Sequence, residues 1–433
     1  MKTDLLKKLE NKSFVIGVIG LGYVGLPLLY CFIEKGFRAI GFDIDKSKVD
    51  ALGKGKSYIK HIPSERIQRG ISSGRLGVTT DFTRLKECDA ILIAVPTPLN
   101  KNREPDMSFI VLTCEAIAPH LRKGQLIVLE STTYPGTTEE VMVPILERGG
   151  MKVDKDFYVA FSPEREDPNN PNFTTETIPK VVGSTSPDGL AVVDLLYKQI
   201  VVRTVPVSSV KVAEATKLME NIFRAVNIAL VNELKVTFMK MGIDVWEVIE
   251  GAKTKPFGYM PFYPGPGLGG HCIPIDPFYL TWKAREYGVT TKFIELAGEI
   301  NTAMPDFVVG RVMDALNEVG KPLKGAKILM MGLAYKANVD DDRESPSYHL
   351  LEKLEEKGAT VSYNDPYIPV IGPKREFAKF VGRKSVELSN NFDLILIATA
   401  HDEYKKIDFS KITIPIVDSR NLIPGNQRLL FKA

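Results

Sequence analysis

The chain has few cysteines and no long apolar run. Its four cysteines in 433 residues are far apart, with no CxxC pair and no metal-ligand spacing, so we expect reduced thiols and no metal site. No segment reaches 18 consecutive apolar residues, so the sequence predicts no membrane-spanning helix. Residues 1–14 are charged throughout and lack the apolar core of a signal peptide, which leads us to expect a cytoplasmic protein.

Neither sign of charge is in excess. The 56 lysines and arginines nearly balance 53 aspartates and glutamates, for a formal net charge of +3. This balance gives no reason to expect a nucleic-acid partner. Hydrophobic residues make up 44% and charged residues 25%, as in ordinary globular proteins, which excludes a disordered chain. At 433 residues, we expect roughly three domains.

Apolar runs that alternate with a helical pattern near the N-terminus predict a doubly wound sheet. Residues Phe14–Gly20 are apolar and end at glycine, which is typical of a buried parallel strand. A helix is predicted over Val24–Lys35 and a second strand over Phe37–Phe42, which completes a βαβ unit. Further strands are predicted at Ala90–Val95 and Leu126–Glu130, as in a doubly wound sheet.

A long amphipathic pattern and a second α/β pattern follow. From Ser208 to Gly242 apolar residues recur every three or four positions, which predicts a helix that joins domains or builds a subunit interface. A strand is then predicted at Ala326–Met331, and Asn391–Glu403 echoes Cys88–Asn100. We therefore predict an α/β fold with two Rossmann-like, doubly wound parallel-sheet domains joined by a helical domain with a long central helix. The expected boundaries are 1–205, 206–321 and 322–433.

A glycine-rich turn follows the first predicted strand. Gly20, Gly22 and Gly25 form GxGxxG, and Asp43 ends the next strand 18 residues after Gly25. The glycines permit a tight turn and close approach of a pyrophosphate to a helix N-terminus. Asp43 can accept both ribose hydroxyls and would repel a 2′-phosphate, so the pattern favours NAD over NADP. The alternative is a glycine-rich turn that binds nothing.

Two hydroxyl-bearing loops follow later strands. Thr97 lies in Pro96–Pro98, and Thr132 follows Ser131. In open α/β sheets, ligands bind at the carboxyl ends of the strands, so these hydroxyls are candidate contacts to cofactor or substrate. Stabilisation of the turns is an equally good interpretation.

The segment Pro264–Cys272 combines four glycines and two prolines with a terminal cysteine. Glycines allow main-chain N–H groups to face an anion such as a diphosphate, and they give a thiol access to substrate. The other cysteines, Cys31, Cys88 and Cys114, fall in or beside predicted helices and strands and look like small core residues. The loop alone leaves open whether Cys272 is a nucleophile or an inert thiol.

Three further polar residues have two interpretations each. Lys217 and Asn221 are four positions apart and share a helix face, either aimed into a site or forming a solvated edge. Glu164 is either a catalytic carboxylate or a surface charge in a loop.

Together these motifs resemble the nucleotide-sugar 6-dehydrogenases, the UDP-glucose and UDP-N-acetylhexosamine dehydrogenase family. The resemblance covers nearly the whole chain. It is carried by GLGYVGLPL at Gly20–Leu28, VPTP at Val95–Pro98, STTYPGTT at Ser131–Thr138, SPE at Ser162–Glu164, EATKLMENIFRAVNIALVNEL at Glu214–Leu234, PGPGLGGHCIPIDP at Pro264–Pro277 and GLAYKANVDDDRESP at Gly332–Pro346.

The resemblance implies an enzyme that oxidises C6 of a UDP-sugar to the uronate, with two hydride transfers to NAD. Cys272 matches the nucleophile that forms a thiohemiacetal and then a thioester. The residues Lys217, Asn221 and Asp276 match those that handle protons, a water and the oxyanion. Glu164 matches a carboxylate of the hydrolytic half, and Thr132 matches a residue beside the nicotinamide and the catalytic water.

The resemblance also implies two sets of binding residues and a partner. The cofactor contacts would be Gly20, Gly22, Tyr23, Val24, Gly25, Asp43, Thr97, Thr132 and Arg343. The substrate contacts would be Glu164, Arg165, Lys217, Asn221, Tyr263, Gly265, Gly267, Gly269 and Lys336. Family members are commonly homodimers built on the long central helix, and no metal, nucleic acid or membrane partner is implied.

The cysteine loop departs from the UDP-glucose branch of the family. Ile275 precedes Asp276 where that branch usually has lysine, and His271 precedes Cys272. The loop resembles the N-acetylhexosamine branch, and within it the UDP-N-acetylglucosamine 6-dehydrogenases; UDP-glucose and UDP-N-acetylmannosamine remain alternative substrates. The aromatic residues just upstream form either an apolar wall for an acetamido methyl or part of the core: Phe257, Tyr259, Phe262 and Tyr263.

Two other functions also couple such a sheet to a helical segment. A hydroxyacid dehydrogenase would transfer two electrons and needs neither a thiol nor a second α/β domain. A non-catalytic nucleotide-sugar-binding protein would retain the fold without the reaction. The combination of Glu164, Lys217, Asn221, Cys272 and Asp276 argues against both.

Overall fold

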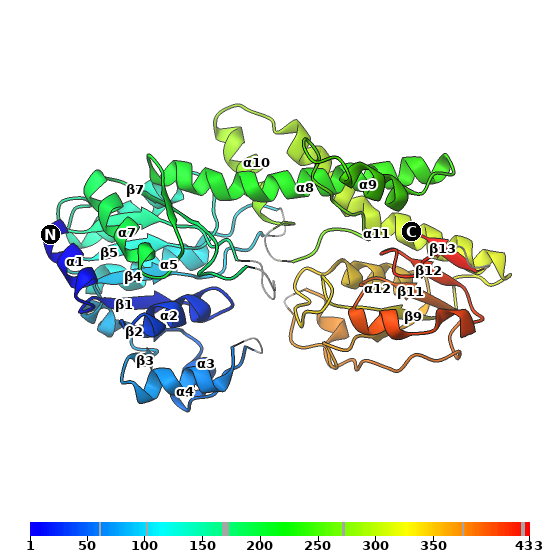
Figure 1. Ribbon diagram of the computed structural model, residues 1–433, viewed down its shortest axis with the longest axis horizontal. Helices are drawn as coiled ribbons and strands as arrows, with labels where there is room; N and C mark the ends of the chain where they lie inside the picture. The colour runs from blue at the N-terminus through cyan, green and yellow to red at the C-terminus, as the bar shows by residue number, and fades with distance from the viewer. Residues whose placement is uncertain (60–61, 101–102, 167–172, 271–272, 375, 426–428) are drawn as a thin grey trace. The chain divides into compact units, whose positions relative to one another are not determined.

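Two separate sheets organise the chain (Figure 1). The structure is a computed structural model that describes residues 1–59, 62–100, 103–166, 173–270, 273–374, 376–425 and 429–433. It forms two compact units, one of Met1–Glu220 with Phe278–Val289 and one of Asn221–Pro277 with Thr290–Ala433. The predicted fold class, with two α/β sheets and a long helix, is confirmed.

The first unit contains an eight-stranded sheet in the order β3-β2-β1-β4-β5-β6-β7-β8. The strands are β1 (Val15–Ile19), β2 (Arg38–Phe42), β3 (Leu76–Thr79), β4 (Ala90–Ile93), β5 (Leu126–Leu129), β6 (Tyr158–Phe161), β7 (Lys180–Ser184) and β8 (Thr204–Pro206). Neighbouring strands are parallel except for β6 and β7, which are antiparallel. This reversal was not predicted, and it brings the first residue of β7 to the edge where β5 and β6 end.

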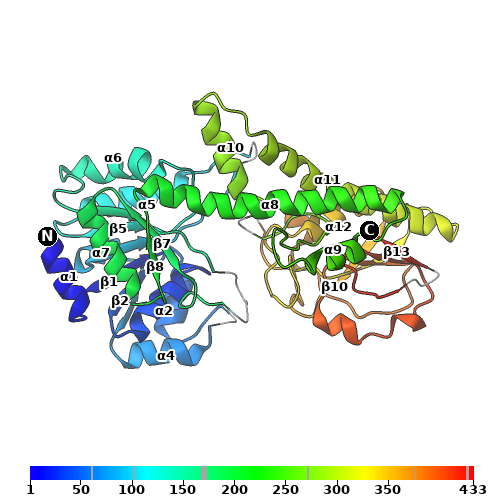
Figure 2. The same cartoon turned by 45° about the horizontal axis from the view of Figure 1, so that its top comes forward.

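Helices cover both faces of this sheet, which explains why its strands are continuously apolar. One face packs against α1 (Lys2–Glu10), α2 (Gly25–Glu34) and α7 (Pro187–Lys198), as Figure 2 shows. The other face packs against α5 (Ser108–Ile117) and α6 (Val143–Leu146). The helices α3 (Lys46–Gly53) and α4 (Ser64–Ser72) lie between β2 and β3 in the chain.

The predicted long helix is α8, which runs over Val210–Lys240. At 1.5 Å per residue, its 31 residues span about 46 Å. The division between the two units falls on this helix, after Glu220. It is followed by α9 (Val245–Lys253), α10 (Asp276–Glu286) and α11 (Lys292–Glu318).

The second unit contains a five-stranded parallel sheet in the order β10-β9-β11-β12-β13. The strands are β9 (Lys327–Met331), β10 (Thr360–Asn364), β11 (Leu394–Ile397), β12 (Ile416–Asp418) and β13 (Leu430–Lys432). One face packs against α11 and α12 (Pro346–Glu356), and the other is covered by loops and short turns. The short helical turns of the chain are Phe82–Glu87, Ala118–His120, Thr138–Met142, Glu147–Gly149, Ala378–Phe380, Asp402–Lys406 and Phe409–Lys411.

The two sheets share one hydrogen-bond arrangement after their second strand in the chain. In the first sheet Asp43, after β2, accepts a hydrogen bond from the N–H of Leu21 at 2.9 Å. In the second sheet Asp365, after β10, accepts one from the N–H of Leu333 at 2.7 Å. None of the helices in the described ranges combines the length and apolar character that a membrane crossing needs.

Candidate active site

The glycine-rich turn joins β1 to α2 in the first unit. Gly20 has a left-handed φ of +91°, and a Cβ there would lie 2.4 Å from the carbonyl oxygen of Ala94. A Cβ on Gly25 would lie 1.9 Å from the carbonyl oxygen of Gly20. Around Gly22, by contrast, a Cβ would meet nothing within 4 Å. Two of the glycines are therefore required by packing, while the third leaves open space in front of the N-terminus of α2.

Asp43 is buried beside this turn. One carboxylate oxygen accepts from the N–H of Leu21, and the other accepts from the N–H of Asp45 at 2.9 Å. Lys48 forms an ion pair with the same carboxylate at 3.1 Å. The open space at Gly22 and a fixed acid at the end of β2 fit the pyrophosphate and adenosine ribose of NAD.

The hydroxyl loops lie at the carboxyl ends of β4 and β5. The Ser131 hydroxyl donates to the carbonyl of Val95 at 2.7 Å, so it stabilises the turn, as the second interpretation predicted. Thr97 is buried, and its carbonyl accepts a hydrogen bond from the Tyr279 hydroxyl. Thr132 is half-buried beside Ser131. Both predicted threonines thus lie at the edge of the sheet where ligands bind.

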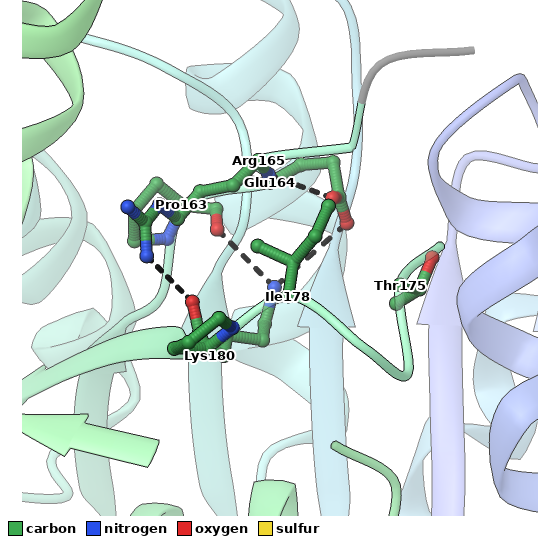
Figure 3. Close-up of a pocket in the computed structure, with 7 residues that line it drawn as sticks. Pro163, Glu164, Arg165, Thr175, Ile178 and Lys180 are labelled. Atoms are coloured by element: carbon green, nitrogen blue, oxygen red, sulfur yellow. Dashed lines mark hydrogen bonds and ion pairs between the residues drawn. The ribbon is translucent and has the colours of Figure 1, made fainter. Parts of the chain in front are cut away.

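Glu164 lies in the turn after β6, with most of its side chain buried. One carboxylate oxygen accepts from the N–H groups of Arg165 and Glu166, at 2.7 and 2.6 Å. The Arg165 guanidinium pairs with Glu220 at 2.6 Å. Figure 3 shows a small cavity at this turn, lined by Pro163, Glu164, Arg165, Thr175, Ile178, Pro179 and Lys180. Its volume of about 10 Å³ has room for roughly one water molecule.

Lys217 is a buried lysine on α8. Its exposed fraction is only 8%, so the solvated-edge interpretation is wrong. Within the part of the chain that the structure describes, no carboxylate or carbonyl pairs with its ammonium group. A buried cation without a counter-ion is available to stabilise negative charge on a ligand.

Asn221 follows one turn later on α8 and is 1% exposed. Its side-chain amide donates to the carboxylate of Asp276, the first residue of α10, at 2.6 Å. This bond connects two of the predicted catalytic residues. It also ties the segment after the cysteine loop to α8.

The glycines of the cysteine loop pack closely within the second unit. A Cβ on Gly265 would lie 2.4 Å from the guanidinium of Arg420. One on Gly269 would lie 2.8 Å from the Cβ of Tyr335, and one on Gly267 would lie 3.1 Å from that of Pro346. Packing therefore requires glycine at position 269, and the left-handed φ of +138° favours it at position 267.

Two residues of α8 hold the start of this loop. The side chain of Asn232 accepts from the N–H of Gly265 at 3.0 Å and donates to Asn301 at 2.9 Å. The ammonium group of Lys235 reaches the carbonyl oxygen of Gly265 at 3.4 Å. Burial lowers the pKa of Lys235 to about 7, and the positive charge of Arg420 adds to the effect.

The remaining predicted contacts lie on loops of the second unit. Arg343 pairs with both carboxylate oxygens of Asp341, and its carbonyl accepts from the N–H of Gly270 at 3.2 Å. The Lys336 ammonium lies 5.9 Å from the ring of Tyr335. The Tyr263 hydroxyl donates to Glu250 at 2.6 Å.

The upstream aromatic residues are not core. Phe257 is 71% exposed, and Tyr259 and Tyr263 are also exposed. Phe262 packs against the ring of Phe223, and Tyr263, although exposed, stacks on the ring of Trp246. The core interpretation is therefore wrong for three of the four residues.

Cys272 and His271 lie outside the described residues. The other three thiols, Cys31, Cys88 and Cys114, are buried and unpaired by disulfides, as predicted. Burial raises the pKa of each to about 12, so none of them is a reactive thiolate. No cluster of three metal-ligating side chains occurs among the residues with a described placement.

Comparison with known proteins agrees with this arrangement along the chain. Residues 14–201 match the NAD binding domain of the UDP-glucose/GDP-mannose dehydrogenase family, 211–303 its central domain and 329–425 its UDP binding domain. A UDP-N-acetyl-D-glucosamine 6-dehydrogenase of Pseudomonas aeruginosa is 36% identical over 404 residues, which cover 93% of this chain and 94% of that protein. The chain belongs to the UDP-glucose/GDP-mannose dehydrogenase family.

Other family members share the whole length. A UDP-N-acetyl-D-mannosamine dehydrogenase of Pyrococcus horikoshii is 34% identical over 94% of this chain and 96% of its own. The structure titled UDP-D-ManNAc dehydrogenase from the same organism superposes with a TM-score of 0.86 and 33% identity, covering 97% of this chain and 99% of that one. The UDP-glucose dehydrogenase structure from Pyrobaculum islandicum superposes with a TM-score of 0.84 at 27% identity, covering 97% of this chain and 96% of that one.

The protein is accordingly an NAD-dependent UDP-sugar dehydrogenase. Sequence reasoning missed several residues around the site of this family member. Glu130, Lys180 and Tyr197 form a buried cluster behind Glu164, and Asn232 and Lys235 hold Gly265. A charged residue at either end of a wholly apolar strand, such as Glu130 after LIVL or Lys180 before VVGS, was the available signal.

Proposed function

We propose that the enzyme oxidises C6 of UDP-N-acetylglucosamine to the uronate in four electrons. The observation that carries this proposal is the buried hydrogen bond between Asn221 and Asp276. This bond fixes the side chains of both residues. Asp276 is four residues after Cys272 in the chain, and Asn221 is one helical turn after Lys217. Such a fixed pair of an amide and a carboxylate suits the stabilisation of oxyanions at a cysteine-bound carbon.

The residues divide the chemistry into steps. A base or a held water removes the C6 hydroxyl proton as the alcohol becomes an aldehyde. The Cys272 thiolate adds to that aldehyde, and the resulting thiohemiacetal is oxidised to a thioester. Lys217 and Asn221 stabilise the oxyanions, and Asp276 or Glu164 positions the water that releases the carboxylic acid and frees the thiol. When bound at the Gly22 turn, NAD supplies the hydride acceptor for each oxidation.

The choice of sugar rests on the loop Pro264–Pro277 and on relatives. The loop resembles the N-acetylhexosamine branch, and a relative carries the name UDP-N-acetyl-D-glucosamine 6-dehydrogenase. Other relatives are named for UDP-N-acetyl-D-mannosamine and for NDP-N-acetyl-D-galactosaminuronic acid. The discrimination is expected to be modest, since a pocket's preference for one methyl-sized group contributes roughly 1–3 kcal/mol.

Initial rates on a panel of nucleotide sugars test the substrate. UDP-N-acetylglucosamine, UDP-N-acetylmannosamine, UDP-N-acetylgalactosamine and UDP-glucose are compared at equal, subsaturating concentration. We expect the highest kcat/KM for UDP-N-acetylglucosamine. A higher value for any other sugar contradicts the substrate while leaving the reaction class intact.

The stoichiometry of NADH tests the reaction. We expect two NADH and one acid per sugar, and Cys272→Ala should abolish the complete reaction. Cys114→Ala is the matched control, because Cys114 on α5 is buried against the first sheet and has no proposed role. One NADH per sugar would instead indicate a two-electron dehydrogenase, and none would indicate a non-catalytic binding protein.

We further propose that the chain has three functional parts and works as a homodimer in the cytoplasm. The parts are 1–205 for NAD, 206–321 for the cysteine loop and interface, and 322–433 for the UDP-sugar. Exposed apolar side chains on α8, namely Met219, Phe223 and Leu230, support an interface there. Three buried, unpaired thiols support a reducing compartment.

A further inference from the structure

A wholly buried ion pair lies at the ligand edge of the first sheet. Glu130 directly follows β5, and Lys180 is the first residue of β7, which runs antiparallel to β6. The two side chains are 0% and 5% exposed, and the ammonium lies 2.8 Å from Oε2 of Glu130. A well-packed apolar pair stabilises a fold equally well or better, so stability alone does not account for these charges.

Tyr197 completes the coordination of Glu130. Its hydroxyl, presented from α7, donates to the other carboxylate oxygen, Oε1. The ammonium of Lys180 also lies 5.0 Å from the Tyr197 ring centroid. Both oxygens of Glu130 are therefore engaged by the protein, and this carboxylate serves as a fixed anchor for Lys180.

The remaining contacts of Lys180 are to the turn that carries Glu164. Its ammonium donates to the carbonyl of Pro163 at 3.2 Å and lies 3.8 Å from Oε2 of Glu164 (Figure 3). Burial alone would lower the pKa of Lys180, but the carboxylates of Glu130 and Glu164 outweigh it and raise the pKa. The lysine is therefore charged throughout the working range of pH, and it contacts both the backbone and the side chain of this turn.

We propose that Lys180, anchored by Glu130 and Tyr197, is a positioning residue that holds Glu164 in place for the hydrolytic half of the reaction. The inference rests on the proposed function, because only a thioester mechanism has a hydrolytic half. The other carboxylate oxygen of Glu164, Oε1, accepts from the N–H groups of Arg165 and Glu166. Lys180 is the contact that approaches its second oxygen from the interior of the sheet.

The test uses the full-length enzyme and a charge-balanced double variant, Glu130→Gln with Lys180→Met. Removing both charges leaves no unpaired buried ion, and the amide that replaces the Glu130 carboxylate can still accept from the Tyr197 hydroxyl. Since both oxidations precede hydrolysis, we expect a rapid burst of two NADH per chain with the amplitude of the wild type. The steady-state rate should then fall by about tenfold to a hundredfold, as for other misplaced groups.

Two further measurements separate positioning from a general structural effect. Intact mass spectrometry during turnover should show the uronyl adduct accumulating on the variant. Adding Glu164→Gln to the double variant should slow it no further, because Lys180 acts through Glu164. Lys198→Met is the matched control, since Lys198 is an exposed lysine on the neighbouring helix α7 and should leave all rates unchanged.

The outcomes are distinct. Normal steady-state turnover of the double variant, or an equal loss in burst and steady-state rates, overturns the inference for Lys180. A further slowing on adding Glu164→Gln also overturns it, because the two residues would then act independently. If the wild type gives only one NADH per sugar, the proposed function fails first, and the inference fails with it.

Discussion

Buried lysines are the most informative single residues in this enzyme. Lys180 has two carboxylate partners, Lys235 has a carbonyl and an aromatic ring, and Lys217 has no partner among the described residues. A buried ammonium without a carboxylate is costly, so each unpaired lysine requires either a ligand or a lost proton. Lys217 is a candidate for contact with a ligand, and the pKa of Lys235, which burial lowers to about 7, favours loss of its proton.

For Lys217→Met we expect kcat to fall about a hundredfold or more, because an oxyanion donor is removed. The free energy of unfolding should change little or rise, since a desolvated charge is replaced by an apolar group of similar length. Steady-state kinetics and thermal unfolding measure the two effects. The control is Lys211→Met on the same helix, where the lysine is exposed and pairs with Glu139 and Glu140. Normal turnover of Lys217→Met would show that this lysine has no catalytic role.

Lys235 predicts a pH dependence of stability. Its pKa is about 7 in the folded protein against an ordinary value of 10.5, so between these values the unfolded chain holds a proton that the folded chain lacks. The free energy of unfolding should therefore rise with pH across this window, by at most ~5 kcal/mol in all. Lys235→Met removes this contribution.

The measurement is urea unfolding of wild type and Lys235→Met at pH 6.5, 8 and 9.5. The variant should be the more stable protein at pH 6.5, and the difference should shrink as the pH rises. A difference that stays constant with pH contradicts the assignment. Lys240→Met, at the exposed end of α8, is the control and should give no pH-dependent difference.

At the scale of elements, the glycines of the β1–α2 turn have different roles: Gly25 is required for packing, and we expect Gly22 to be required for binding. Gly25→Ala places a Cβ against the Gly20 carbonyl and should destabilise the fold by about 2 kcal/mol or more. Gly22→Ala meets open space, and Gly22 is not in the left-handed region, so the fold should be retained. NAD affinity should nevertheless fall by at least about tenfold, because the methyl group occupies the approach of the pyrophosphate. Thermal unfolding and NAD titration check both, and normal NAD affinity of Gly22→Ala would contradict the binding site.

The elements that could be predicted are those set by local pattern. The strands β1 and β9 and the helices α2 and α8 lie where apolar periodicity placed them, within a few residues. Asp43 was predictable because its distance from the glycine turn follows from the length of one βαβ unit. The burial of Lys217 was not predictable, because the sequence pattern at the edge of a helix is the same whether that edge faces water or packs against protein.

Long-range arrangements were beyond the sequence for a physical reason. The reversal of β7 depends on how the chain returns to the sheet, and an apolar strand has the same pattern in either direction. The Glu130–Lys180 pair joins residues 50 positions apart and depends on that reversal. The hydrogen bonds between Gly265 and the side chains of Asn232 and Lys235 likewise join a helix to a loop that is distant in the chain.

At the scale of the molecule, two sheets of one pattern have diverged in detail. Asp43 and Asp365 both accept from the N–H groups that follow the first strand of their sheet. Asp365 is also contacted by the buried ring of His401 at 3.1 Å, whereas Asp43 pairs with the half-exposed Lys48. This difference agrees with the assignment of the cofactor to the first sheet, where the family's NAD binding domain matches.

The exposed apolar residues of α8 predict the oligomeric state. Leu230 is 51% exposed, Met219 and Phe223 on the same helix are exposed as well, and we expect Leu230 to be covered in a homodimer. Leu230→Asp should convert the protein to a monomer in sedimentation equilibrium, because a carboxylate would be buried in the interface. Val202→Asp, at an exposed apolar position before β8 and outside α8, is the control and should stay dimeric. A Leu230→Asp protein that sediments as a dimer would exclude this part of α8 as the interface.

The contact between Lys180 and the Pro163–Glu164 turn also has a consequence for how the family can vary. These residues stand at the two ends of one connection, so their contact closes a loop. The entropy of closing a loop grows only with the logarithm of its length, and each doubling costs about 0.6 kcal/mol. The intervening residues can therefore lengthen or change sequence while the closure itself stays in place. This connection is a place where evolution can alter the surroundings of Glu164 at little cost to the stability of the sheet.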